Sequence, residues 1–123
     1  MNKGRNFKGG AYRDSEEGKL DYEGFLSPIV LSEFAKYMHK HRIQSNGKLR
    51  DSDNWQKGIP KGVYMKSMCR HFMGVWLEHR GYESRDGMID ALCGLLFNVQ
   101  GYLFEVLKEK MESDNKAYKE VFG

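Results

Sequence analysis

The sequence contains few of the residues that stiffen or cross-link a small protein: only 2 prolines and 2 cysteines occur in 123 residues. Cys69 and Cys93 fall in segments with helical periodicity, and no apolar signal core precedes them, so we expect reduced thiols rather than a disulfide. No apolar run reaches the roughly 18 residues that a membrane span needs. We therefore expect a cytoplasmic protein that is not associated with a membrane.

The chain also lacks a strong charge of either sign. Its net charge is +3 and its isoelectric point is about 8.8. Domains that bind nucleic acid usually lie above about 9, so we expect no nucleic acid polymer as a partner, whereas a small anionic ligand fits this charge. No HExxH or CxxC motif is present to indicate zinc. Glycine, in contrast, is abundant, and 14 glycines with little proline favour close helix contacts and sites lined by backbone.

Helical periodicity dominates the chain and predicts an all-α fold, a small bundle of three to four helices with a long ordered loop. Helices are expected at about 28–43, 62–80 and 87–112, with a late helical turn near 118–121 and no strand. Ser27 caps the first of these, and Ser84 or Asp86 caps the third. Residues 1–12 are expected to be a basic flexible arm, and residues 13–123 a single helical domain.

The third expected helix is apolar around much of its circumference. Eight of its residues are expected to form the core seam: Met88, Leu92, Leu95, Leu96, Val99, Leu103, Val106 and Leu107. Phe97 and Phe104 lie on another side, and three helices cannot easily cover both sides. Because large apolar patches are rare on monomers, we expect a homo-oligomer, most simply a two-fold dimer.

Two of the expected helices each carry a polar stripe where a core helix should be apolar. At 100° per residue, one stripe on residues 62–80 contains Ser67, His71, Gly74 and Glu78. The stripe on the next helix contains Gly87, Asp90, Gly94, Asn98, Gly101 and Glu105. Facing stripes of this kind indicate a polar cleft between the helices. The alternative is an interhelical hydrogen-bond network that only stabilises the bundle.

The polar residues suggest a site for a phosphate-bearing ligand. Asp90 and Glu78, helped by Asp53, are candidate ligands for Mg²⁺, and His71 is a candidate general base. The long loop at 44–62 adds Asn54, Trp55 and Lys57, of which Trp55 either stacks on a base or fills the core. The remaining candidates for ligand contacts are Arg13, Lys19, Arg70 and Asn98.

The order of these motifs resembles a known family. Arg13-Asp14 and Gly18-Lys19 are followed by Asn54-Trp55-Gln56-Lys57-Gly58, then by Arg70-His71, and finally by Phe97-Asn98. This order is similar to that of the mostly phage and bacterial dATP/dGTP diphosphohydrolase N-terminal domain family, and it spans roughly residues 10–105. The resemblance implies cleavage of a purine deoxynucleoside triphosphate to the monophosphate and pyrophosphate with Mg²⁺, in the host cytoplasm if the protein is phage-encoded.

In the hydrolase interpretation, Asp90 and His71 are catalytic. An alternative is a protein that sequesters a nucleotide or a nucleotide-derived signal without turnover. The hydrolase is the leading interpretation, and one feature supports the alternative: Lys36-Tyr37-Met38-His39 stands where the family pattern has an acidic residue. A third interpretation is a structural protein whose polar stripes only fix the helix register.

Overall fold

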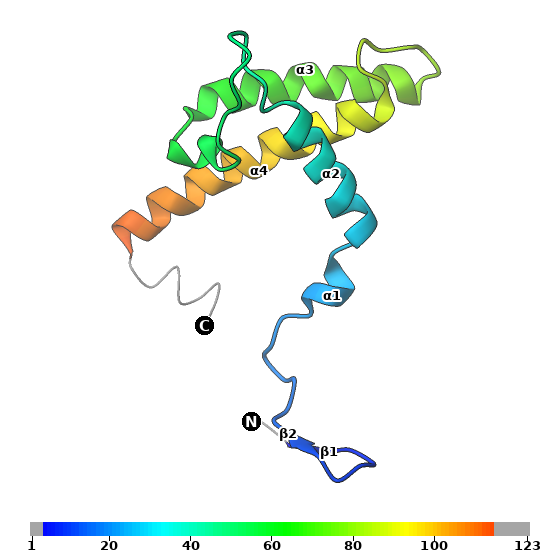
Figure 1. Ribbon diagram of the computed structural model, residues 1–123, viewed down its shortest axis with the longest axis vertical. Coiled ribbons are helices and arrows are strands. Elements are labelled where there is room, and N and C mark those ends of the chain that lie inside the picture. The colour runs from blue at the N-terminus through cyan, green and yellow to red at the C-terminus, as the bar shows by residue number, and fades with distance from the viewer. Residues whose placement is uncertain (1–3, 115–123) are drawn as a thin grey trace. The chain divides into compact units, whose positions relative to one another are not determined.

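The computed structural model describes residues 4–114, most of which are helical. In chain order the elements are β1 (Arg5–Asn6), β2 (Tyr12–Arg13), α1 (Tyr22–Phe25), α2 (Pro28–Lys40), the 3₁₀-helix η1 (Asn54–Lys57), α3 (Lys61–His79) and α4 (Met88–Ser113), as Figure 1 shows. The three long helices therefore lie close to their expected positions. The helical turn expected near 118–121 lies outside the described residues.

A small sheet corrects the expectation of an entirely helical fold. Strands β1 and β2 pair antiparallel, with Arg5 opposite Arg13 and Asn6 opposite Tyr12. Gly10 lies in the connecting turn with φ +88°, in the left-handed region that glycine adopts without steric cost. These strands were not predicted, because two residues are too few to show an alternating pattern. The protein is thus mostly helical with one two-stranded sheet.

The chain divides into two compact units, Met1–Leu31 and Ser32–Gly123. In the first unit, Asp21 caps α1 by accepting a hydrogen bond from the backbone N–H of Gly24 at 2.9 Å. Ser27 caps α2 as expected, because its hydroxyl oxygen accepts from Val30 N–H at 3.3 Å. Helix α2 begins in this unit and ends in the second.

In the second unit, α3 and α4 form an antiparallel helical hairpin (Figure 1). The facing stripes predicted from the sequence meet here, but they pack closely instead of forming an open cleft. The ring of Tyr64 occupies the space beside Gly101, and the ring of His71 occupies the space beside Gly94. Each α4 glycine therefore receives one ring from α3. Gly87, with φ +82°, is the N-cap residue of α4 in place of the expected Ser84 or Asp86.

The apolar core differs from the expected one. Among residues 4–114, the buried apolar side chains are those of Tyr64, Ala91 and Cys93. Five members of the expected α4 seam are instead exposed: Leu92, Leu96, Val99, Leu103 and Val106. The prediction of an apolar core seam on α4 was wrong because glycine, alanine and asparagine face α3. Small residues allow the two backbones to approach closely, which large side chains do not.

Candidate ligand-binding site

A cavity of about 500 Å³ lies where the end of α2, the 41–59 segment, α3 and α4 meet. All of its walls belong to the second unit. Cationic, aromatic and amide side chains line it, namely Tyr37, His39, His41, Arg42, Arg50, Asn54, Trp55, His71, Phe97 and Asn98, with Asp51 the one carboxylate among the lining residues. A cavity of this volume is large enough for a nucleotide-sized ligand.

Two arginines are fixed at one wall by a short hairpin in the loop. The backbone N–H of Arg50 donates to the Arg42 carbonyl at 2.8 Å, and Arg42 Nε donates to the Arg50 carbonyl at 2.8 Å. An isolated bridge pairs Ile43 with Leu49, and Gly47 adopts φ +80° in the turn between them. The loop expected to be ordered is ordered in this way. It brings Arg42 and Arg50, eight residues apart in the chain, to the lining of the same cavity.

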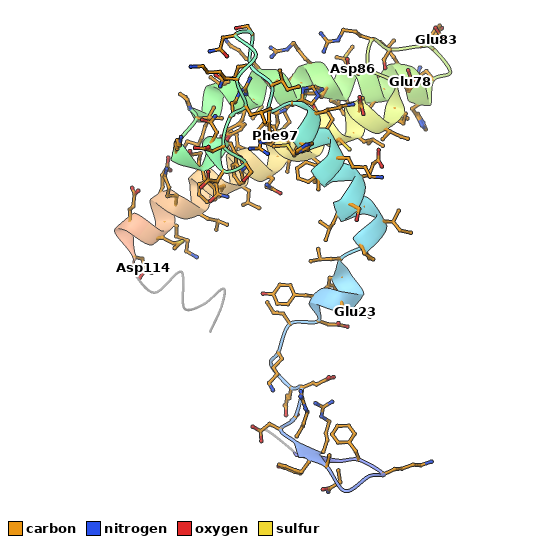
Figure 2. The ribbon with its side chains drawn as sticks, in the orientation of Figure 1. Glu23, Glu78, Glu83, Asp86, Phe97 and Asp114 are labelled. Atoms are coloured by element: carbon orange, nitrogen blue, oxygen red, sulfur yellow. The ribbon has the colours of Figure 1, made fainter. Side chains whose placement is uncertain are left out.

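Aromatic contacts fasten the next part of the loop onto α4. The Trp55 ring centroid lies 5.0 Å from that of Phe104 and 6.1 Å from that of Phe97, both edge-to-face. Such pairs prefer this geometry and stabilise the contact beyond simple area burial. Phe97 lies in the first half of α4 (Figure 2). Trp55 therefore anchors the loop on α4 and also lines the cavity, and its stacking on a base stays a prediction.

His71 and Asn98 contribute from the helical hairpin. Burial lowers the pKa of His71, and Asp86 acts in the opposite direction. The neutral imidazole is therefore favoured, with one nitrogen able to accept a hydrogen bond. Asn98 is 5% exposed, and its side-chain NH₂ donates to the Gly94 carbonyl at 2.7 Å. This bond fixes the amide and leaves the carbonyl oxygen without a hydrogen bond from any described residue.

The cavity brings together four of the predicted site residues: Asn54, Trp55, His71 and Asn98. Lys57 lies on the same loop but is exposed and pairs with Asp51 at 3.6 Å. Arg70 lines a neighbouring cavity of about 430 Å³ and donates to the Ser67 hydroxyl at 2.9 Å. His71 lines both cavities.

Arg13 and Lys19 belong to the first unit. They line a shallow hollow there together with Arg5, Tyr12 and Asp14. Arg5 is also ion-paired with Glu16 at 3.1 Å. The hollow thus contains three cations beside one aspartate, and contact of Arg13 and Lys19 with the ligand stays a prediction.

The predicted acidic residues do not converge. Asp90 pairs with Lys40 of α2, and Glu78 accepts a hydrogen bond from the backbone N–H of Ser84. Glu78 lies at the α3–α4 connection, well away from Phe97 (Figure 2). Asp53 precedes η1 and makes no side-chain capping bond. Within residues 4–114, no three His, Cys, Asp or Glu side chains are grouped to hold a metal ion.

Glu105 has a structural role, as in the interhelical hydrogen-bond network that was the alternative interpretation of the polar stripes. Its carboxylate accepts from the backbone N–H of Ile59 at 3.1 Å and pairs with Lys108 at 3.4 Å. It therefore holds the segment before α3 against α4. At the opposite end of the hairpin, Glu78 does the same for the α3–α4 connection. Two of the three acids of the polar stripes, Glu78 and Glu105, therefore hold the segments at the two ends of the hairpin.

Five cavity residues were missed as site residues: Tyr37, His39, His41, Arg42 and Arg50. The sequence does contain a signal for three of them, because His39-Lys40-His41-Arg42 is a basic run at the end of a helix. Such a run is also typical of an ordinary helix C-terminus, where cations are favoured by the helix dipole. The run alone therefore could not distinguish a binding wall from a cap.

No protein family, curated protein or solved structure matches this chain. The resemblance to the diphosphohydrolase family accordingly remains a prediction from the motifs.

Proposed function

We propose that this protein binds a nucleotide in the cavity formed by α2, the loop, α3 and α4. The observation that carries the proposal is the combination of two arginines, three aromatic rings and a buried amide around one space of about 500 Å³. A nucleotide presents the matching groups, which are phosphates, a flat base and hydrogen-bonding base edges.

Arg42 and Arg50 are the phosphate ligands in this proposal. Arg42 uses Nε in its bond to the Arg50 carbonyl, so its two terminal nitrogens remain for a ligand. The Arg50 side chain has no ion pair or hydrogen bond among the described residues. Asp51, the carboxylate among the lining residues, forms an ion pair with Lys57. The wall is therefore cationic, and arginine binds phosphate oxygens through two parallel hydrogen bonds.

Trp55, Tyr37 and Asn98 are the base ligands. Aromatic side chains stack on nucleobases with roughly 1–3 kcal/mol per base. The free carbonyl oxygen of Asn98 is an acceptor for an exocyclic amino group, and Asn54 supplies a second amide at the rim. An acceptor of this kind favours a base with an exocyclic amino group, which adenine and guanine have and thymine lacks, consistent with the purine deoxynucleotide that the family resemblance implies.

The family resemblance also implies Mg²⁺-dependent cleavage to the monophosphate and pyrophosphate. The acids expected to hold the ion are separately engaged in pairing with Lys40 and in binding the Ser84 N–H. These residues do not fit a shared metal site as they are arranged. Retention of the nucleotide without turnover therefore takes precedence over the hydrolase in this proposal.

The proposal is tested by calorimetric titration with dATP, dGTP, dTTP and ATP, each with and without Mg²⁺. We expect a purine nucleotide to bind, and Arg50→Ala to weaken binding by at least about tenfold, as for loss of a charge-assisted phosphate contact. Lys66→Ala is the matched control, because Lys66 is an exposed cation of α3 outside the cavity. Failure of every nucleotide to bind, or equal loss in both variants, would overturn the proposal.

The same mixtures decide between retention and hydrolysis. Pyrophosphate release is measured over hours at a nucleotide concentration well above the protein concentration. Nucleotide recovered intact supports a sequestering protein. Multiple turnovers would instead establish the diphosphohydrolase that the resemblance implies, and would require the acidic residues to rearrange when the ligand binds.

A further inference from the structure

Helix α4 carries a row of apolar side chains on the side away from α3. Six residues form the row, Ile89, Leu92, Leu96, Val99, Leu103 and Val106, and they are between 39% and 61% exposed. Successive members are alternately three and four residues apart. We call this row the α4 seam. A 3-4 spacing is the pattern of a helix that packs along its length on another helix.

We propose that the α4 seam binds the α4 seam of a second copy of this chain, antiparallel and around a two-fold axis. This inference is independent of the nucleotide proposal and rests on other residues. A two-fold interface must be complementary to itself. The 3-4-3-4-3 spacing reads the same in both directions, so reversing one copy sets Ile89 on Val106, Leu92 on Leu103 and Leu96 on Val99.

The small core of the protomer leaves apolar surface for a partner to cover. Within residues 4–114, only three apolar side chains are buried, while the six seam residues remain exposed. The exposed seam amounts to roughly 500 Å², against about 800 Å² per partner in a standard interface. Leu95, Tyr102 and Leu107 flank it half-buried and extend the same apolar face. A second copy of the chain is a partner that is always available to cover this face.

The charges of α4 favour self-association over other partners. Residues 91–104 contain no charged side chain, as in obligate homodimer interfaces and unlike surfaces that bind charged partners. By length and composition α4 also qualifies as a membrane span. However, the face packed on α3 carries buried Asn98 and the ion pair of Glu105 with Lys108, so only one side of the helix is apolar.

The antiparallel direction follows from the helix ends. Parallel pairing would set Lys110, the next position of the seam, against its own copy. It would also align the two helix dipoles, with both positive ends together. Antiparallel pairing separates the two lysines and opposes the dipoles.

The first test is the mass of the full chain in solution by light scattering at micromolar concentration. We expect twice the chain mass of 14.3 kDa. Leu96→Glu, which buries a charge at the centre of the seam, is expected to raise the dissociation constant at least about 100-fold. Phe72→Glu is the control, because Phe72 is equally apolar and 50% exposed but lies on α3. Circular dichroism checks that both variants remain helical.

A wild-type monomer would overturn the proposal, as would a Leu96→Glu variant that stays dimeric or a Phe72→Glu variant that dissociates. Binding of the wild-type chain to neutral phosphatidylcholine vesicles in a flotation assay, lost in Leu96→Glu, would also overturn it and assign the seam to a membrane.

The second test does not depend on a variant that dissociates. In a background of Cys69→Ser and Cys93→Ala, single cysteines are introduced as Ile89→Cys and Val106→Cys. Antiparallel pairing predicts disulfide dimers only when the two proteins are mixed under mild oxidation. Cross-linking of Ile89→Cys with itself would show a parallel pair and overturn the assigned direction, and no cross-link in any sample would overturn the interface.

Discussion

Gly101 sits where α4 passes Tyr64 of α3, and we expect Gly101→Ala to destabilise the protein. A Cβ atom at this position would lie 2.2 Å from Tyr64 Cε1 and 2.3 Å from Tyr64 Cζ. These are atoms of a rigid ring and cannot give way as the end of a flexible side chain does. Tyr64 is 1% exposed, and its ring packs edge-on against Phe97 with centroids 5.9 Å apart. The ring can move only by separating α3 from α4.

The expected loss combines two opposing effects. Alanine is favoured over glycine in a helix interior by about 1 kcal/mol. Overpacking a filled site costs typically 1–3 kcal/mol, occasionally more, and a whole ring in the way indicates the upper end of that range. The net expectation is a destabilisation of about 2 kcal/mol. Gly62→Ala is the control, because Gly62 lies in α3 and a Cβ atom added there would meet nothing within 4 Å, so this change should stabilise by about 0.4–1 kcal/mol.

The measurement is urea unfolding followed by helical circular dichroism, with all variants at one protein concentration because association shifts apparent stability. A double variant isolates the cause. In a Tyr64→Ala background the obstruction is gone, so Gly101→Ala should no longer destabilise and its helical preference should show. A Gly101→Ala protein as stable as the wild type would refute the close packing of Tyr64 on α4.

Three further outcomes are expected. Trp55→Ala should lower the free energy of unfolding in urea by about 2 kcal/mol. This loss is below the roughly 3–5 kcal/mol expected for fully buried aromatic residues, because Trp55 is only half-buried. In calorimetry, Trp55→Ala should weaken nucleotide binding more than Trp55→Phe does. Asp90→Asn removes an exposed pair with Lys40, so it should change the free energy of unfolding by at most about 1 kcal/mol and leave nucleotide affinity unchanged. Because burial lowers the pKa of His71, the unfolded chain binds the proton more tightly, so wild-type stability should fall as the pH drops below about 6.5, and His71→Gln should flatten this fall in melting temperatures.

The facing polar stripes could be predicted because helix period and glycine spacing are properties of the sequence. Which face of α4 packs on α3 could not be predicted from the sequence. Periodicity tells which residues share a face, whereas the choice of face depends on the neighbouring helix. Leu96 and Val99 are the more apolar candidates, yet Gly94 and Gly101 face α3 because Tyr64 and His71 supply rings that fill the space beside them.

The binding cavity was predictable only in part for a similar reason. Asn54 and Trp55 stand out in a long loop, and the loop does line the cavity. Arg42 and Arg50 are brought together by two backbone-mediated hydrogen bonds between positions eight residues apart, which no helical or alternating pattern encodes. Glu78 was predicted to bind a metal ion, but it accepts a hydrogen bond from the backbone N–H of Ser84. Its position in the sequence is compatible with either role, so the sequence could not distinguish them.

Helix α4 connects the two proposals, because the cavity and the seam use adjacent residues of one element. Phe97 and Asn98 line the cavity, and Leu96 and Val99 flank them in the seam. Dimerisation would order α4 and with it one wall of the cavity before the nucleotide binds. The conformational entropy of α4 would then already be lost when the nucleotide binds, which would strengthen nucleotide binding. Such coupling is reciprocal, so the nucleotide should also strengthen the dimer. The expected result is weaker nucleotide binding by Leu96→Glu than by the wild type in calorimetry, although Leu96 does not line the cavity. Equal affinities would show that α4 is already rigid in the monomer.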